Sequence, residues 1–154
     1  IASKIGAPGN PEYAVGAVAP DGEITPSPYG GYSLPELQHL GRDVRDKIAR
    51  RLELYRAGTH RTPIEGAIAI LVDDGIATGL TTIAAAEYLY RNGADEVIIA
   101  VPVVAADTAY RLREQVDDVV ALEEPQVFHA VGQFYRHFEQ TSDDEVLAAL
   151  SGRR

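Results

Sequence analysis

Two adjacent carboxylates and the small-residue loop after them are the residues of this chain best suited to chemistry. Asp73 and Asp74 follow an apolar run directly, and the loop behind them carries glycines and the hydroxyls of Thr78 and Thr81. Carboxylates accept hydrogen bonds from hydroxyl groups, whereas backbone N–H groups at the turn into a helix bind anions. Gly79 has no Cβ, so a ligand can approach the backbone there. The combination predicts a ligand with both vicinal hydroxyls and a phosphate, as a sugar phosphate has.

Alternating strand and helix patterns place this loop at the end of a strand. We expect strands and helices to alternate in the order residues 67–72, 78–92, 97–104, 106–116 and 119–122. This βαβαβ order is typical of a parallel sheet with helices on its faces. The continuous apolar run at 67–72 indicates a strand that is covered on both faces. Ligands bind beyond the carboxyl ends of such strands, where Asp73 and Asp74 lie.

The flanking regions complete a single α/β domain over residues 1–154. Residues 1–36 are rich in glycine and proline and predict a flexible segment with one strand at 14–19 and otherwise loop. A helix is expected from residue 37 to about residue 57, with Gly58 as its stop. Residues 123–141 are irregular, and the Ser142-x-x-Glu145 capping box starts a last helix.

Composition excludes several classes of protein. The 154 residues carry a formal charge of −9, which disfavours nucleic acid and anionic membranes as partners. The absence of cysteine excludes disulfides, thiol catalysis and cysteine-bound zinc. No apolar run reaches the length of a membrane span and no signal peptide is visible, so we expect a cytoplasmic protein. The chain begins at Ile1 and has no methionine, so we expect the natural protein to extend further at its N-terminus.

Other classes of site can also place acids at a strand end. A receiver domain does so, but it needs a lysine on a later strand, and Lys4 and Lys47 both lie upstream. Neither a P-loop motif nor a G-x-G-x-x-G motif occurs. A solvated strand end without a ligand remains the simplest alternative for Asp73 and Asp74.

The motif VDDGIATGLT at residues 72–81 resembles the signature of type I phosphoribosyltransferases, which bind 5-phosphoribosyl-1-pyrophosphate (PRPP). Residues 4–12 and 138–146 are also similar to one subgroup of that family. The resemblance implies a Rossmann-like phosphoribosyltransferase fold with flanking helices. It assigns Asp73 and Asp74 to the ribose hydroxyls. It assigns the 5′-phosphate to Ala77, Thr78, Gly79, Leu80 and Thr81.

The resemblance also implies a reaction. The phosphoribosyl group would pass from PRPP to a nitrogen nucleophile, a nucleobase, with release of pyrophosphate. Asp73 and Asp74 would anchor the sugar near the developing positive charge, and Lys4 would fold over the substrate to meet the pyrophosphate. Mg²⁺ would be held mainly by substrate oxygens and water, with no protein ligand of its own. The expected partners are PRPP and an acceptor, and a second copy of the chain in a homodimer.

One departure from the family keeps a second function open. Family members bind pyrophosphate with a glycine-containing loop after an earlier strand, and no such loop is found in this chain. We therefore expect an N-terminally truncated domain. The alternative function is a non-catalytic module that binds PRPP or a ribose phosphate. A sugar-phosphate hydrolase or phosphatase is a weaker option, because it needs a metal cluster or a nucleophile.

The side chains outside the motif have ordinary explanations beside the functional ones. The alternative for Lys4 is an ordinary exposed lysine near the N-terminus. The chain's three phenylalanines gather with Tyr135 late in the sequence and could stack on an acceptor base or cover a sheet edge. These three phenylalanines are Phe128, Phe134 and Phe138. For His129 and His137 we expect structural or surface roles.

Overall fold

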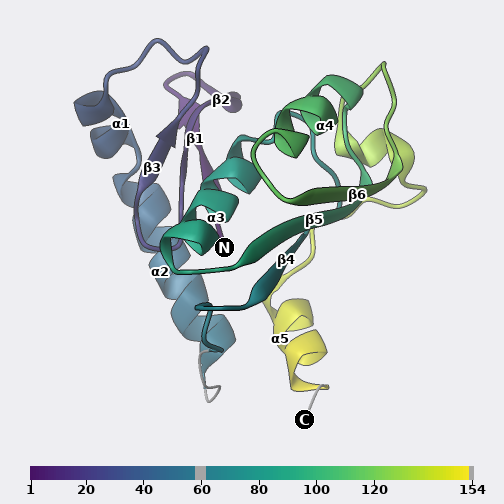
Figure 1. Cartoon of the computed structure of the whole chain (residues 1–154). Helices are drawn as coiled ribbons and strands as arrows, with labels where there is room; N and C mark the ends of the chain where they lie inside the picture. The colour runs from purple at the N-terminus through teal and green to yellow at the C-terminus, as the bar shows by residue number, and fades with distance from the viewer. Residues whose placement is uncertain (58–61, 153–154) are drawn as a thin grey trace.

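Within residues 1–57 and 62–152, which the computed structural model describes, the fold is organised around one parallel and one antiparallel sheet (Figure 1). The parallel sheet has the order β4-β5-β6, with β5 in the middle. The helices α3 and α4 connect these strands. The bounds of the five elements are β4 (Ile68–Val72), α3 (Leu80–Arg91), β5 (Glu96–Val103), α4 (Ala106–Arg113) and β6 (Asp118–Glu123). The predicted α/β class with a parallel βαβαβ unit is confirmed.

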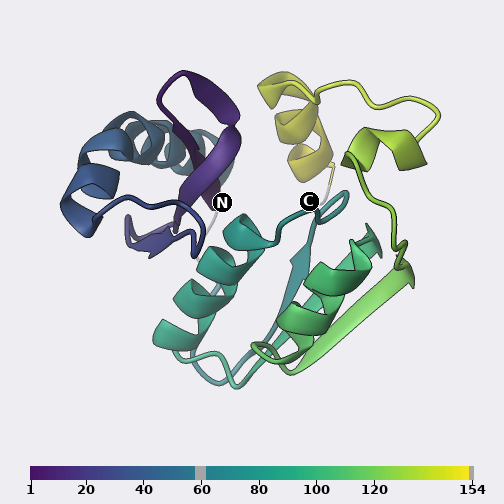
Figure 2. The same cartoon turned by 90° about the horizontal axis from the view of Figure 1, so that it is seen from above.

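Both connecting helices cover the same face of the parallel sheet (Figure 2). Alternate residues of β5 point toward them, and Val97, Ile99 and Val101 are buried. They pack with Leu112 of α4 and Ala86 of α3 in one apolar core. This core holds the carboxyl ends of the strands, and therefore the acidic pair, in fixed positions.

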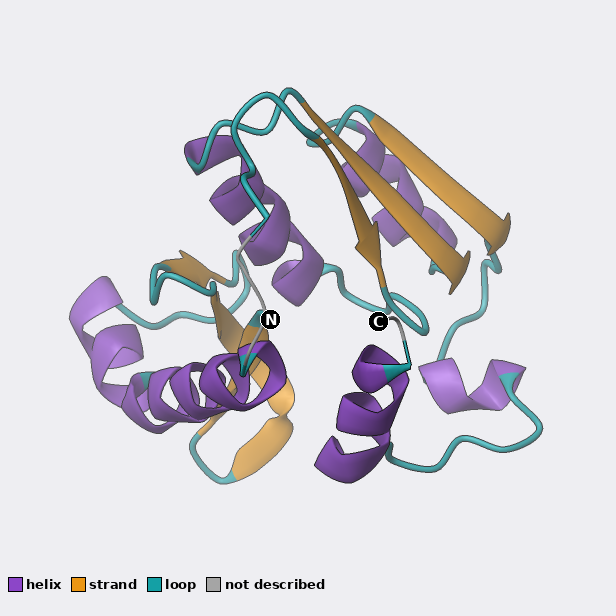
Figure 3. Ribbon diagram, turned by 90° about the horizontal axis from the view of Figure 1, so that it is seen from below, coloured by secondary structure: helices purple, strands orange, loops and turns teal. Residues whose placement is uncertain are grey.

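The opposite face of the parallel sheet is exposed (Figure 3). Ile68, Ile70 and Val72 of β4 are 60%, 61% and 76% exposed, and Leu122 of β6 is 80% exposed. The expectation that residues 67–72 are covered on both faces is therefore wrong for this chain. The apolar run reflects a strand that presents large side chains on both faces, while the helices α3 and α4 lie on one side only.

Asp117, just before β6, links elements at the amino-terminal end of the parallel strands by hydrogen bonds. Its Oδ2 accepts hydrogen bonds from the backbone N–H of Val97, at 2.8 Å, and from the hydroxyl of Tyr90, at 2.7 Å. These donors stabilise the charged form, so they hold the pKa of the Asp117 carboxyl below its usual value, the Val97 amide contributing most. Burial and the nearby carboxylate raise the pKa of Tyr90 to about 12.

The N-terminal third forms an antiparallel sheet in the order β1-β2-β3. The strands are β1 (Ser3–Ala7), β2 (Asn10–Val18) and β3 (Ile24–Pro26). The sequence predicts only the middle strand, and the expectation of loop for the rest of residues 1–36 is wrong. The prolines lie near strand ends, Pro11 early in β2 and Pro26 at the end of β3, where a missing N–H is tolerated. Cross-strand pairing, which local composition does not reveal, stabilises the short strands.

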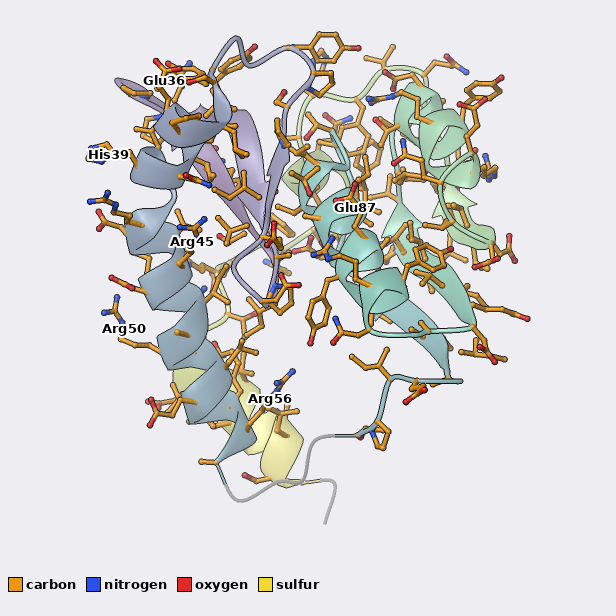
Figure 4. The ribbon with its side chains drawn as sticks, turned by 60° about the vertical axis from the view of Figure 1, so that its left-hand side comes forward. Glu36, His39, Arg45, Arg50, Arg56 and Glu87 are labelled. Atoms are coloured by element: carbon orange, nitrogen blue, oxygen red, sulfur yellow. The ribbon has the colours of Figure 1, made fainter. Side chains whose placement is uncertain are left out.

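Two helices replace the single helix expected at residues 37–57. They are α1 (Leu34–Leu40) and α2 (Arg42–Arg56), separated at Gly41, and α1 begins with a capping box between Ser33 and Glu36. The predicted stop at Gly58 lies outside the described residues. The buried side chains of Leu37 and Ile48 pack against the antiparallel sheet. Figure 4 shows His39 and Arg50 on the outer side of these helices, directed away from the sheets.

The two sheets meet at α3. Ala17 of β2 packs against Leu80 and Ala84 of α3 in a small apolar cluster. Two polar links flank it. The Thr25 hydroxyl donates to the Glu87 carboxylate at 2.6 Å, and Arg91 pairs with Asp21 at 3.0 Å. Figure 4 shows Glu87 on the α3 side that faces the antiparallel sheet.

The C-terminal segment returns to the N-terminal helices. A short 3₁₀ turn (Val131–Phe134) follows β6, and α5 (Asp143–Ser151) begins at the predicted capping box. Ser142 N–H donates to Glu145 Oε2 at 2.8 Å, which confirms the box. Asp143 of α5 contacts Arg51 and Tyr55 of α2. Among the described helices, none has the length and apolar composition needed to cross a bilayer.

Candidate functional site

The loop between β4 and α3 is anchored to the neighbouring strand β5. Ile76 is buried, its N–H donates to the Val103 carbonyl at 2.9 Å, and its carbonyl accepts from Ala105 N–H at 3.0 Å. Gly79 precedes α3 with a φ of +76°, the left-handed region that favours glycine. The first N–H groups of a helix have no acceptor within the helix, so a helix start of this kind is suited to bind an anion.

The acidic pair lies at the end of β4, as the sequence predicts. Asp74 N–H donates to Asp73 Oδ1 at 2.9 Å, and the Tyr135 hydroxyl donates to the Asp74 carbonyl at 2.6 Å. Burial raises the pKa of the Asp73 carboxyl, and the negative charge of Asp74 adds to the effect. A hydroxyl-rich or cationic ligand would relieve this cost, because it supplies donors or positive charge to the carboxylate.

The site opens into a cleft of about 1600 Å³ between the two sheets. Asp73 lines it, and so do all five residues of the expected phosphate loop, 77–81. Asp74 lies outside the cleft lining, although it neighbours Asp73 along the chain. Lys4 and Glu12 of the antiparallel sheet form part of the facing wall, where the Lys4 ammonium pairs with the Glu12 carboxylate at 2.8 Å.

The aromatic segment after β6 divides into two parts. Phe128 stacks with Phe134, with ring centroids 5.1 Å apart, and Tyr135 lies beside Phe138 at 5.2 Å. Phe138 lines the cleft together with His129, whereas Phe128 and Phe134 do not. Of the aromatic side chains in this segment, Phe138 is therefore the one placed to meet a ligand in the cleft, and its stacking on an acceptor base stays a prediction.

Helix α4 contributes two side chains that sequence reasoning did not single out. The Thr108 hydroxyl is buried and donates to the Ala77 carbonyl at 2.7 Å, and Arg111 Nη2 donates to Thr108 Oγ1 at 2.9 Å. Both residues line the cleft. A threonine and an arginine three residues apart on a short helix give no local motif. The cue is their position just after the second strand of the βαβ unit, whose carboxyl end meets that of β4.

Comparison with known proteins identifies the class. Residues 39–139 match the family described as "Phosphoribosyl transferase domain". The chain is also 42% identical, over 97% of its length, to "Putative phosphoribosyl transferase Rv0571c" of Mycobacterium tuberculosis strain H37Rv and to its counterpart in strain CDC 1551. The chain belongs to the phosphoribosyltransferase family.

A solved structure shows the same fold. The crystal structure of TT1426 from Thermus thermophilus superposes with a TM-score of 0.76 at 39% sequence identity, covering 97% of this chain. This confirms the phosphoribosyltransferase fold expected from the motif. The chain spans 73% of the TT1426 chain and 35%, about a third, of the mycobacterial relatives.

Proposed function

We propose that this chain binds PRPP in the cleft and transfers the 5-phosphoribosyl group to a nitrogen nucleophile of the nucleobase class, releasing pyrophosphate. The observation that carries the proposal is that an acidic strand end and a glycine-led helix start open into one cleft, lined by Asp73 and residues 77–81. Membership of the family supports the transferase class.

Each half of the site suits one half of a ribose phosphate. The carboxylates of Asp73 and Asp74 would accept hydrogen bonds from the 2′- and 3′-hydroxyls of ribose. The N–H groups of Ala77 and Gly79, with their neighbours, would donate to the 5′-phosphate, and the helix start adds partial positive charge. The hydroxyls of Thr78 and Thr81 supply further donors.

The reaction in this proposal is a displacement at the anomeric carbon of ribose. The acceptor nitrogen forms a bond to this carbon and passes its proton to water or to the departing pyrophosphate. The bond to the pyrophosphate oxygen breaks, and pyrophosphate leaves with the electron pair. Positive charge develops on the ribose ring, and the carboxylates of Asp73 and Asp74 stabilise it. The protein's main work is to hold the two reactants in line.

Mg²⁺ is the cofactor that this family membership implies, and the site suits it in part. The ion prefers carboxylate, phosphate and water oxygens. Asp73 offers a carboxylate at the cleft, and Asp74 is its neighbour along the chain. No group of three or more histidine or acidic side chains gathers into a metal site within the described residues. We propose that substrate phosphates and water hold Mg²⁺ beside Asp73, where the ion would neutralise the charge of the pyrophosphate.

The size of the cleft leaves room for an acceptor. Its volume of about 1600 Å³ exceeds the roughly 300–1,000 Å³ of ordinary small-molecule pockets. Phe138 is partly exposed at the wall opposite the antiparallel sheet and offers a face on which a planar heterocycle can stack. We propose that Lys4 leaves Glu12 and contacts the pyrophosphate when PRPP binds.

Calorimetric titration with PRPP, with and without Mg²⁺, tests the proposal. We expect Mg²⁺-dependent binding that is lost in Asp73→Asn/Asp74→Asn. The matched control is Asp46→Asn/Glu53→Gln, which removes the same charge from positions of α2 outside the cleft. The control should bind as the wild type does.

The outcomes separate the functions. Binding followed by pyrophosphate release, in a screen of nucleobases, supports the transferase. Binding of ribose 5-phosphate with no gain from the pyrophosphate group would replace the transferase by a ribose-phosphate-binding module. Equal losses in the two double variants would contradict the role given to Asp73 and Asp74.

A further inference from the structure

Within the described part of the chain, one cation that lines the cleft has no carboxylate at salt-bridge distance. Among the described residues that line the cleft, Lys4 and Arg111 carry the full positive charges. Lys4 is paired with Glu12, whereas no described carboxylate lies within salt-bridge distance of Arg111. Two residues further along α4, Arg113 is paired with Glu124 and does not line the cleft. The same helix therefore presents a neutralised arginine on one side and an available one at the cleft.

A buried hydroxyl fixes the available guanidinium beside the phosphate loop. Thr108 is 2% exposed, and its proton goes to the Ala77 carbonyl, so a lone pair of Oγ1 remains to accept from Arg111 Nη2. A single hydroxyl thus separates the guanidinium from the backbone of the loop. Thr108 Cγ2 also lies within 3.0 Å of where a Cβ on Gly79 would stand, which places this threonine against the turn itself.

The loop itself carries no positively charged side chain to balance the charge of its proposed ligand. Residues 75–82 contain no cationic side chain, so backbone dipoles and hydroxyls alone would face a phosphate dianion. Arginine binds phosphate through two parallel N–H···O contacts that are stronger than neutral hydrogen bonds. With Nη2 held by Thr108, the remaining N–H donors of Arg111 are not used by any described residue.

We propose that Arg111 is a phosphate-binding residue that completes the anion site of loop 77–81 from outside the loop, and that Thr108 is the positioning residue that orients it. The inference rests on the proposed function, since it deepens the phosphate half of the same site. It predicts that phosphate recognition depends on α4 as well as on the turn into α3.

Titrations followed by ¹H–¹⁵N NMR spectra test the proposal with two probes, inorganic phosphate and ribose 5-phosphate. Arg111→Gln should weaken binding of both probes roughly tenfold or more, because a charge-assisted hydrogen bond is lost. Arg113→Gln removes the same charge from the same helix and should change affinity less than about twofold at physiological salt. Arg111→Lys should fall between, since it keeps the charge and loses the planar fork.

The role of Thr108 is tested by a pair of variants. Thr108→Val keeps the volume and removes the hydroxyl, so it should weaken phosphate binding, whereas Thr108→Ser should restore it. Thermal unfolding of each variant, without ligand, identifies any loss of fold. Equal phosphate affinity in folded Thr108→Val and Thr108→Ser would overturn the positioning role.

The two probes separate this inference from the proposed function. Weaker binding in Arg111→Gln but not in Arg113→Gln supports the inference. If ribose 5-phosphate then binds no more tightly than inorganic phosphate, the proposed function fails while Arg111 keeps its role. If the wild type prefers ribose 5-phosphate and the two glutamine variants bind it alike, the role of Arg111 is overturned and the proposed function stands. If the folded wild type binds neither probe, both fail.

Discussion

Gly79→Ala is the substitution that most directly tests whether the turn before α3 is a working anion site. Gly79 has a φ of +76°, and a Cβ there would stand 3.0 Å from Thr108 Cγ2. Gly66→Ala is its matched control. Gly66 has a φ of +72°, has nothing within 4 Å of its Cβ position, and lies at the opposite end of β4.

The two variants differ by the contact with Thr108. The left-handed backbone costs any non-glycine residue about 1–2 kcal/mol, so this cost applies to both. The close contact at Gly79 adds about 1 kcal/mol of overpacking. With about 3 °C per kcal/mol for a domain of this size, Gly66→Ala should lower Tm by about 3–6 °C and Gly79→Ala by about 6–9 °C.

Ligand binding separates the variants further. Relief of the contact with Thr108 must move the loop, which misaligns its N–H donors, so Gly79→Ala should weaken ribose 5-phosphate binding roughly tenfold or more. Gly66→Ala should bind as the wild type does. Thermal unfolding by circular dichroism and calorimetric titration give the two quantities. Equal affinities of two folded variants would refute the assignment of this turn to phosphate.

Four further predictions concern the surroundings of the site. Burial raises the pKa of Asp73 in the folded state, so the protonated carboxyl favours folding at acid pH, and this stabilisation is lost as the pH rises through that pKa. Asp73→Asn, which cannot ionise, should therefore raise Tm at neutral pH and leave it unchanged at about pH 3. For Asp117 the pH dependence of stability is reversed, because a backbone amide of β5 lowers the pKa of its carboxyl in the folded state. Asp117→Asn should lower Tm at neutral pH, and the loss should disappear on acidification. Changes of Tm in the same direction for Asp73→Asn and Asp117→Asn at neutral pH would contradict the reasoning. Tyr135→Phe removes the bond to the Asp74 carbonyl and should cost about 1 kcal/mol in urea unfolding, with weaker ribose 5-phosphate binding; unchanged stability and affinity would show that this bond does not support the strand end. Leu122→Gln on the exposed sheet face should reduce binding of a hydrophobic dye without lowering Tm, and a marked drop in Tm would mean that Leu122 is part of the core.

The parallel sheet could be predicted from sequence because its signals are local. Each strand is a run of apolar residues, and each helix shows its own period, so the βαβαβ order is visible without knowledge of any contact. The antiparallel sheet has no such signal. β1 and β3 are stabilised by pairing with β2, and the sequence around them is dominated by turn residues. Gly41 divides α1 from α2 although the apolar spacing continues through it.

The same distinction applies to the candidate site. The acidic pair and residues 77–81 are contiguous, so one motif predicted them. Thr108 and Tyr135 reach the loop from 31 and 61 positions away in the chain, as their hydrogen bonds to the Ala77 and Asp74 carbonyls show, and Arg111 is held in turn by Thr108. Only the fold brings them together, because the carboxyl ends of neighbouring parallel strands share one edge.

The small contact between the two sheets has a consequence for how the protein opens. Each sheet has its own core, and at α3 they meet through a small cluster of Ala17, Leu80 and Ala84 and through two exposed polar links. A buried methyl group contributes only about 0.8 kcal/mol, and an exposed ion pair about as little. We therefore expect amide protons of β1 and β2 to exchange with solvent through a partial opening in which those of β5 stay protected. In that opening the antiparallel sheet, whose strand β1 carries Lys4, loosens while the core around β5 stays folded, so we expect a ligand to gain access to the cleft from the side of the antiparallel sheet.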